Sequence, residues 1–360
     1  MRISLTVTLI GLLLSISTYA QITNVVILDS GEIATLRGVI AGNDRAGQLY
    51  DSIITLAYQH LSESPRPLKQ LHYEGILNNN PDRVDTRKSL EDMDKVINLI
   101  YTSYGQDQAS LGEKVKEFVL AWANTYQPTG NTINENKFVA LFWGYHFFQS
   151  RFSEAEQAIV RSWMTHIAER QMNRARTHNN NWQAKRHKII GIVGCVIHND
   201  SLMSFAQKGF EEYINTAYFP DSTNTDLRQR DALSYHISGL KPLVSASVNL
   251  TAFDSEFDLY HYTAPSGASV QKSVAYVVPY ALCKKTHQEW VNTTVELDKE
   301  RAAAGLAQYQ PGTLFEPKKA VRLFEWASYY HPAWYEIMGR YGFTSTWIGL
   351  LNSPLVRSGR

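Results

Sequence analysis

The segment RQRDALSYHISGLKPLV, residues 228–244, combines two arginines with a Tyr-His pair, a set of side chains able to transfer protons. If residues 228–240 form one helix, Arg228 and Tyr235 lie within about 20° of each other on one face. Arg230 then lies about 140° away from Tyr235. Because a guanidinium stabilises a neighbouring phenolate, we expect Tyr235 to transfer protons. An arginine stacked on a tyrosine at a helix surface is the simpler explanation of the same spacing.

A second polar segment, THNNNWQAKRHK (177–188), directly precedes the apolar run IIGIVGCVI. Asparagines are poor helix formers and good N-caps, so a helix is expected to begin here. Amide groups at a helix start can also donate to a carboxylate, helped by the backbone N–H groups and the helix dipole. A third segment, LHYEGIL (71–77), places His72, Tyr73 and Glu74 before a loop.

Helical periodicity dominates the chain and must position these segments. Apolar residues recur at helical spacing in four stripes, one of them behind a Ser153/Glu156 capping box, and turn-rich breaks separate them. The stripes are Leu90/Met93/Val96/Ile97/Ile100, Ile159/Trp163/Ile167, Met203/Ala206/Phe210/Tyr213/Ala217 and Leu233/Ile237/Leu240/Val244. We therefore expect an all-α fold, and repeated hairpins of roughly 40 residues suggest an (α/α) toroid whose loops meet in one cleft.

The N-terminus, MRISLTVTLIGLLLSISTYA, has the features of a secretory signal peptide: one charge, an apolar stretch and small residues before Gln21. We expect residues 1–20 to be removed and the mature protein to be periplasmic or secreted. No second apolar span follows, so no membrane attachment is expected after removal. Residues 21–360 are expected to form a single catalytic domain.

Composition excludes several classes of partner. The formal net charge is +1, so no overall field favours nucleic acid. The two cysteines, Cys195 and Cys283, can either pair or remain buried thiols. No ligand spacing points to a metal and no motif points to a nucleotide, so we expect no metal and no cofactor. Aromatic residues are abundant and serve the core first, but they also suit the apolar face of a sugar.

The order of the motifs resembles polysaccharide lyase family 5 and the wider alginate lyase superfamily over roughly residues 70–340. The motifs are YEG, an Asn-Asn-aromatic segment and R-x(6)-Y-H followed by L-x-P-L. GASVQKSVAYVVPYA and KKTHQEWVNTTVELDKERAAAG are similar to segments of alginate-lyase-like proteins near family 38. The resemblance implies an (α/α) toroid that acts on an anionic polysaccharide, alginate or glucuronan.

The resemblance also assigns site residues. Tyr235 matches the family's catalytic tyrosine, and Arg228 matches the arginine seven residues before it. The RDAL pattern of the second group instead favours Arg230. The active-site asparagine falls on Asn180 or Asn181, since three asparagines leave the register open.

The remaining matches concern the groups around the substrate. Tyr73 matches a tyrosine of a lid-like segment, with His72 where the family often has lysine. The family histidine after the asparagines is missing, since Asn181 or Trp182 stands there. His178 or His187 is the candidate to replace it. Trp182 and His236 are expected, with His72, Tyr73, His187 and Arg230, to contact substrate.

Together these residues predict β-elimination. Asn180, Asn181 and Arg228 would neutralise the uronate carboxylate, and Tyr235 would act as general acid and also as base. Mannuronate-rich alginate is the expected substrate, and glucuronan, with His178 or His187 as base, is the alternative. Two other functions stay open. One is an (α/α) toroid glycoside hydrolase, which needs two carboxyl groups such as Asp231 and Glu74. The other is a non-catalytic polysaccharide-binding protein.

Overall fold

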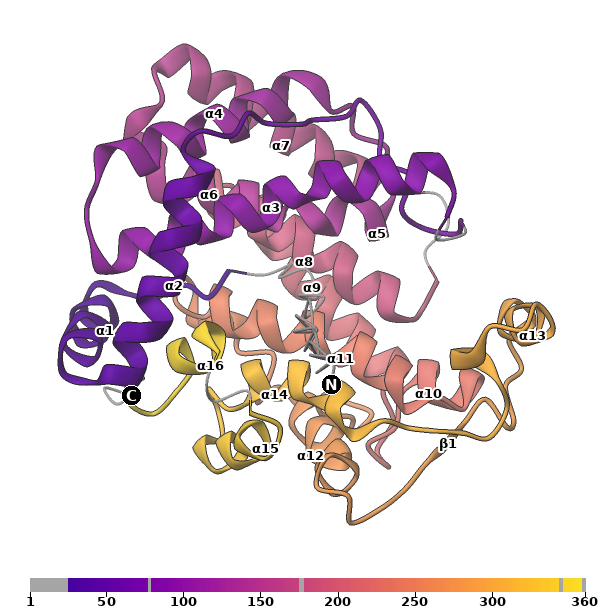
Figure 1. Ribbon diagram of the computed structural model, residues 1–360. Helices are drawn as coiled ribbons and strands as arrows, with labels where there is room; N and C mark the ends of the chain where they lie inside the picture. Colours follow the sequence, from indigo (N-terminus) through magenta and orange to yellow (C-terminus); the bar gives the residue numbers. More distant parts are fainter. Residues whose placement is uncertain (1–24, 77–78, 175–177, 343–345, 358–360) are drawn as a thin grey trace, which may run out of the picture.

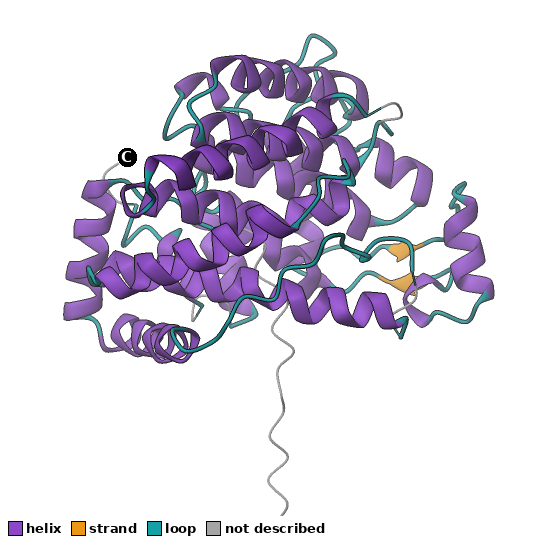
Figure 2. Ribbon diagram, turned by 90° about the horizontal axis from the view of Figure 1, so that it is seen from above, coloured by secondary structure: helices purple, strands orange, loops and turns teal. Residues whose placement is uncertain are grey.

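The computed structural model describes residues 25–76, 79–174, 178–342 and 346–357. The expected signal peptide, residues 1–20, lies outside the described residues. The described chain is helical apart from two short antiparallel strands, β1 (Gln288–Glu289) and β2 (Thr313–Leu314) (Figure 2). The prediction of an all-α fold is confirmed. Within the described residues no helix is both long and apolar enough to cross a membrane.

The helices follow one another along the chain, with longer connections before α3, α12, α13 and α14 (Figure 1). In chain order they are α1 (Ser30–Gly42), α2 (Asp44–His60), α3 (Pro81–Gly105), α4 (Ala109–Thr125), α5 (Thr132–Glu135), α6 (Val139–Phe148), α7 (Glu154–Met172), α8 (Asn181–Val196), α9 (Asp200–Ala217), α10 (Thr225–Arg230), α11 (Leu233–Leu250), α12 (Val270–Ala281), α13 (Glu296–Ala303), α14 (Val321–Ala327), α15 (Tyr335–Arg340) and α16 (Trp347–Leu351).

The four apolar stripes lie on α3, α7, α9 and α11, as their spacing predicts. The capping box is present at the start of α7, where the Ser153 side chain accepts from Glu156 N and the Glu156 carboxylate accepts from Ser153 N. Cys195 and Cys283 are both free, the first buried in α8 and the second exposed. The disulfide between Cys195 and Cys283 that the sequence left open is therefore absent.

Two layers of helices build the fold. α3, α6, α8, α11 and α14 contact one another in this order and form the inner layer. α4 packs outside α3 and α6, α7 against α4 and α8, α9 against α8, and α12 against α11 and α14. This is the predicted (α/α) toroid. Since α8 and α11 both begin at the same end of the inner layer, their first turns can share one cleft.

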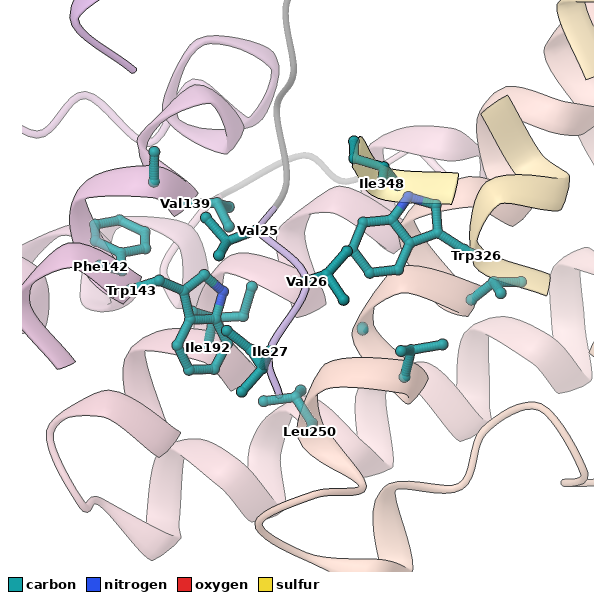
Figure 3. Packing of buried hydrophobic residues seen from close by; sticks show 14 of the residues in the cluster. Val25, Val26, Ile27, Val139, Phe142, Trp143, Ile192, Leu250, Trp326 and Ile348 are labelled. Atoms are coloured by element: carbon teal, nitrogen blue, oxygen red, sulfur yellow. The ribbon is translucent and has the colours of Figure 1, made fainter. Parts of the chain in front are cut away.

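Residues 25–28 run in extended form through the inner layer, far from that cleft. Val26 points toward Trp326 of α14 and Ile348 of α16, while Ile27 lies beside Trp143 of α6 and Leu250 at the end of α11 (Figure 3). All four residues of the segment are at most 6% exposed. The N-terminal segment is therefore part of the hydrophobic core and joins helices that are distant in the sequence.

Side chains, rather than a neighbouring strand, satisfy the backbone of this segment. The Asn249 amide donates to Val25 O (2.7 Å) and accepts from Ile27 N (3.2 Å). The Tyr104 hydroxyl donates to Val26 O (2.8 Å). Because unpaired buried backbone groups are costly, these contacts fix the segment's register.

A buried ion pair joins this end of the chain to the C-terminal region. Arg357 Nη1 lies 2.7 Å from Glu32 Oε2, and both side chains are buried. The same guanidinium donates to Ile27 O (3.2 Å) and to Leu351 O (3.1 Å). Removing one partner of such a pair leaves the other charge buried without compensation.

We predict that Arg357→Met lowers the free energy of unfolding by about 3–5 kcal/mol, because the buried Glu32 carboxylate loses the guanidinium that neutralises it. Denaturant unfolding followed by circular dichroism measures the change. Lys299→Met, which breaks an exposed pair with Glu296, is the control and should change stability by at most about 1 kcal/mol. Similar losses in the two variants would contradict a structural role for the buried pair.

Candidate active site

A cleft of about 710 Å³ lies where the first turns of α8 and α11 meet. α10, α13 and the loop before α3 complete its walls, and these elements can be followed in Figure 1. The lining residues from these elements include Asn180, Asn181, Trp182, Lys185, Arg230, Ser234, Tyr235, Ser238, Arg301, Tyr73, Glu74, Arg83 and His178. The three segments singled out in the sequence therefore meet at one place.

A break between α10 and α11 sets the direction of the two arginines. The continuous helix expected over residues 228–240 is wrong, since α10 ends at Arg230 and α11 begins at Leu233. Asp231 between them adopts left-handed backbone geometry with φ 49°. Glu289 of β1 accepts from Ser234 N (2.7 Å) and so caps the first turn of α11. The helical spacing that placed Arg228 beside Tyr235 does not apply, because the two residues lie on different helices.

Arg228 points away from the cleft. Its Nη2 pairs with Asp221 Oδ2 (2.7 Å), its Nε donates to Thr223 Oγ1 (2.9 Å), and its guanidinium covers the Phe219 ring at 3.5 Å. The Arg228 side chain is about half exposed. The expectation that Arg228 neutralises substrate is therefore corrected, because its charge is already committed at the surface.

Arg230 occupies the position predicted for Arg228. Its guanidinium carbon lies 4.1 Å from the centre of the Tyr235 ring, and Asp298 holds its Nη1. Arg301 Nη1 donates to the Tyr235 hydroxyl at 3.4 Å, and the edge of Trp290 contacts the Tyr235 ring. Two guanidinium groups therefore flank the Tyr235 side chain, one over the face of its ring and one at its hydroxyl.

Sequence reasoning missed Arg301. It stands in the segment KKTHQEWVNTTVELDKERAAAG, whose similarity to known segments was visible but carried no residue assignment. The same guanidinium donates to the Tyr309 hydroxyl at 3.1 Å. Burial, with a smaller effect of the nearby Tyr235, raises the pKa of Tyr309 to about 12, so Tyr309 keeps its proton.

The two asparagines at the start of α8 have different roles. Asn180 is the N-cap, and its side-chain oxygen accepts from Trp182 N (3.1 Å). Asn181 donates to Asp226 of α10 through its backbone N (2.8 Å) and its Nδ2 (3.2 Å). The Asn181 oxygen accepts from Lys185 Nζ (2.5 Å). The plain N-cap explanation thus describes Asn180, whereas Asn181 belongs to a polar network within the cleft.

Asp226 is the buried acid of this network. Burial raises the pKa of Asp226, and the hydrogen bonds from Asn181 partly oppose that rise. The carboxylate also lies 3.8 Å from Arg230 Nε. Asp226 therefore connects α8 to the arginine that covers Tyr235.

Aromatic rings form part of the wall, as expected of a sugar-binding cleft. Trp182 lines it, with the Arg174 guanidinium 4.6 Å from its ring and the His178 ring edge-on to it. The Tyr73 ring lies between two cations, Arg83 at 4.9 Å and Lys137 at 4.5 Å. These contacts fix the orientation of both rings.

The histidines separate into two groups. His178 is exposed and lines the cleft. His72 is also exposed but lies outside the lining, and its backbone N donates to Thr86 Oγ1 (2.9 Å). In the His72-Tyr73 pair, the tyrosine alone faces the cleft.

His187 and His236 are buried structural residues, which corrects their assignment to substrate. His187 packs against Phe205 and Phe210 of α9, and burial lowers its pKa to about 3. The His236 ring lies 3.2 Å from Ser273 O through its Nε2, and burial lowers its pKa to about 4. Both imidazoles are therefore neutral near pH 7, and neither lines the cleft.

Carboxyl groups are scarce at the cleft. Among its described lining residues Glu74 alone carries one. Asp231 lies outside the lining and accepts from Asn292 N (2.9 Å) and Nδ2 (3.0 Å). In the part of the chain that the structure describes, no group of three or more His, Cys, Asp or Glu side chains could hold a metal ion.

The chain is similar to known alginate lyases. The family model for alginate lyase matches residues 42–290. An alginate lyase from Bacteroides ovatus superposes with a TM-score of 0.68 at 15% identity, covering 92% of this chain and 100% of that chain. A search of the curated proteins gives no match.

Two further structures share the fold at lower similarity. Alginate lyase A1-III from Sphingomonas species A1 gives a TM-score of 0.51 at 16% identity, covering 81% of this chain and 93% of that chain. A variant of A1-III complexed with tetrasaccharide gives 0.54 at 17% identity with the same coverage. At these identities the superpositions show the fold alone, whereas the family model spans most of the chain. The chain therefore belongs to the alginate lyase family of polysaccharide lyases.

Proposed function

We propose that this chain cleaves mannuronate-rich alginate by β-elimination, with Tyr235 as the proton-transfer residue. The observation that supports this most is the Tyr235 phenol in the cleft, with Arg230 over its ring and Arg301 at its hydroxyl. The family membership supports a uronate polymer as substrate, and the similar A1-III structure with tetrasaccharide supports an oligosaccharide in such a cleft.

The chemistry sets the demands on the cleft. The C5 proton of a uronate is too weakly acidic to remove unless the adjacent carboxylate is neutralised. Preorganised donors aimed at the developing charge supply this stabilisation. The amides of Asn180 and Asn181 stand at the N-terminus of α8, where the helix dipole also favours negative charge. Arg230 replaces Arg228 as the α10 arginine of the proposed site.

Stereochemistry decides which polymers a lone tyrosine can serve. In mannuronate and glucuronate the C5 proton and O4 lie on the same face of the ring, whereas in guluronate they lie on opposite faces. One phenolate can take the proton and return a proton to O4 on the same face. Glucuronan therefore remains the alternative substrate, but the expectation that it needs His178 or His187 as a separate base is wrong, because its C5 proton and O4 share one face. A guluronate substrate would require one, for which His178 is the histidine in the cleft.

The two other functions have less support. A glycoside hydrolase needs two positioned carboxyl groups, and Glu74 is the one carboxyl among the described residues that line the cleft. A non-catalytic binding protein would have no need of a phenol between two guanidinium groups. Appearance of an unsaturated product distinguishes the lyase from both.

We predict that residues 21–360 raise the ultraviolet absorbance of a mannuronate-rich alginate solution, because elimination creates a conjugated C4=C5 double bond. Tyr235→Phe should lower the rate at least ~1,000-fold, within the range for loss of a general acid–base group. Parallel assays with guluronate-rich alginate and glucuronan identify which polymer is cleaved. No absorbance change with any of the three polymers, from folded protein, would refute the proposed activity.

The two arginines of α10 provide a matched pair of variants. Arg230→Met should lower kcat/KM about 100-fold because it removes a cation beside the reacting phenol. Arg228→Met should change kcat/KM no more than about twofold, since an exposed ion pair contributes little. Steady-state kinetics on the accepted polymer measures both, after thermal melts verify folding. A larger effect at Arg228 would restore the original assignment.

We further propose that the protein is exported and acts in the periplasm or outside the cell, in agreement with a polymeric substrate. The support is the N-terminal sequence pattern. Expressed in a Gram-negative host, the exported protein should have the intact mass of residues 21–360. Leu13→Arg, which places a charge in the apolar stretch, should leave the full-length chain in the cytoplasm. Full-length protein in the periplasm would contradict the cleavage position.

A further inference from the structure

Among the described residues four Lys and Arg side chains line the cleft, and they differ in what already neutralises them. Arg230 is paired with Asp298, and Arg301 Nη1 lies 3.7 Å from the same carboxylate. Arg83 donates to Ile76 O and covers the Tyr73 ring. Lys185 is different: no described carboxylate lies within ion-pair distance of its ammonium, which contacts neutral oxygen atoms instead.

Those contacts place the ammonium between the two helices that carry the proposed chemistry. Lys185 stands four residues after Asn181, on the same face of α8, and its Nζ donates to Asn181 Oδ1 (2.5 Å). On the other side Nζ lies 3.5 Å from Ser238 Oγ, three residues after Tyr235 on α11. The ammonium therefore lies against the Asn181 amide and, on α11, beside the residue one helical turn after Tyr235, at the cleft wall.

The charges around Lys185 are mostly positive. Burial is the main reason that its pKa is lowered to about 8. Asp226 of α10 raises the pKa, while Lys137, which precedes α6, and Lys241 of α11 lower it. Lys188, one turn further along α8, adds less charge than the other two lysines, because burial lowers its pKa well below the usual lysine value. An anion entering here meets an excess of positive charge in a poorly solvated place.

We propose that Lys185, together with Asn181, binds and neutralises the carboxylate of the uronate residue whose C5 proton is removed. This inference rests on the proposed lyase function. The Tyr235 phenolate takes the C5 proton, the C4=C5 bond forms, and the phenol returns a proton to O4 as the C4–O4 bond breaks. Lys185 gains and loses no proton in this step; its ammonium holds the negative charge that develops on the carboxylate oxygens.

An uncharged form of the substrate tests this role. Lys185→Met should lower kcat/KM at least ~100-fold on mannuronate-rich alginate, the cost of losing one stabilising cation. On the propylene glycol ester of the same polymer, which has no carboxylate charge to neutralise, the loss relative to wild type should be below tenfold. Lys299→Met, at an exposed lysine of α13, is the control. Equal losses on acid and ester would overturn the assignment.

The pH profile provides a second readout. If the ammonium must be charged, kcat/KM falls as the pH rises through about 8, where the free enzyme loses that proton. Lys185→Arg keeps its charge throughout this range, so its alkaline limb should move upward by at least one pH unit. An unchanged limb in Lys185→Arg would show that another group titrates and would reject the proposal.

Binding separates this inference from the proposed function. Affinity for a mannuronate oligosaccharide is measured by calorimetry with Tyr235→Phe and with Tyr235→Phe/Lys185→Met, so no turnover is required. The added substitution should weaken binding at least about tenfold, as expected for loss of a charged hydrogen bond. A tenfold loss with an inactive wild type refutes the lyase function but keeps the carboxylate site. Unchanged affinity refutes the site whatever the activity.

Discussion

One buried carboxylate, Asp226, links the helices that carry the amide and the phenol of the cleft. It accepts two hydrogen bonds from Asn181 in the first turn of α8, and it lies 3.8 Å from Arg230, which covers Tyr235. A buried carboxylate without such partners would cost several kcal/mol. Burial of Asp226 therefore also keeps Asn181 and Arg230 in place. Through this single side chain the start of α8, the end of α10 and the ring of Tyr235 are fixed relative to one another.

The cleft attracts an anionic polymer without an overall charge on the protein. The net charge is +1, yet four cations and one carboxyl group line the described walls. Asp298 and Asp226 stand behind the arginines, where they orient them, whereas the Lys185 ammonium faces neutral oxygens. Cations placed in a partly desolvated cleft therefore attract an anionic polymer to that one site, whereas a basic surface would attract it less selectively.

The sequence predicted the elements of this fold better than the contacts between them. Apolar spacing indicates the buried face of a helix, so α3, α7, α9 and α11 could be placed from residue types, although Ile159 of the α7 stripe is exposed. Asparagine runs mark helix starts, which located Asn180 and Asn181. Helical spacing favoured Arg228, with Arg230 kept as the other candidate, because periodicity cannot show that Asp231 takes left-handed geometry and ends the helix.

His187 and His236 were misplaced because spacing does not say which face of a helix meets the cleft. Arg301 acquires its role only from neighbours far along the chain. Lys185 had a readable signal, its four-residue separation from Asn181.

The N-terminal segment described above also orders events in time. Residues 25–28 leave the ribosome early, but their backbone partner Asn249 is made more than 220 residues later. The inner layer can close only after nearly the whole chain exists, and such long-range closure is slow. If the chain is exported as proposed above, it must stay unfolded while it crosses a membrane, and this topology gives it time to do so.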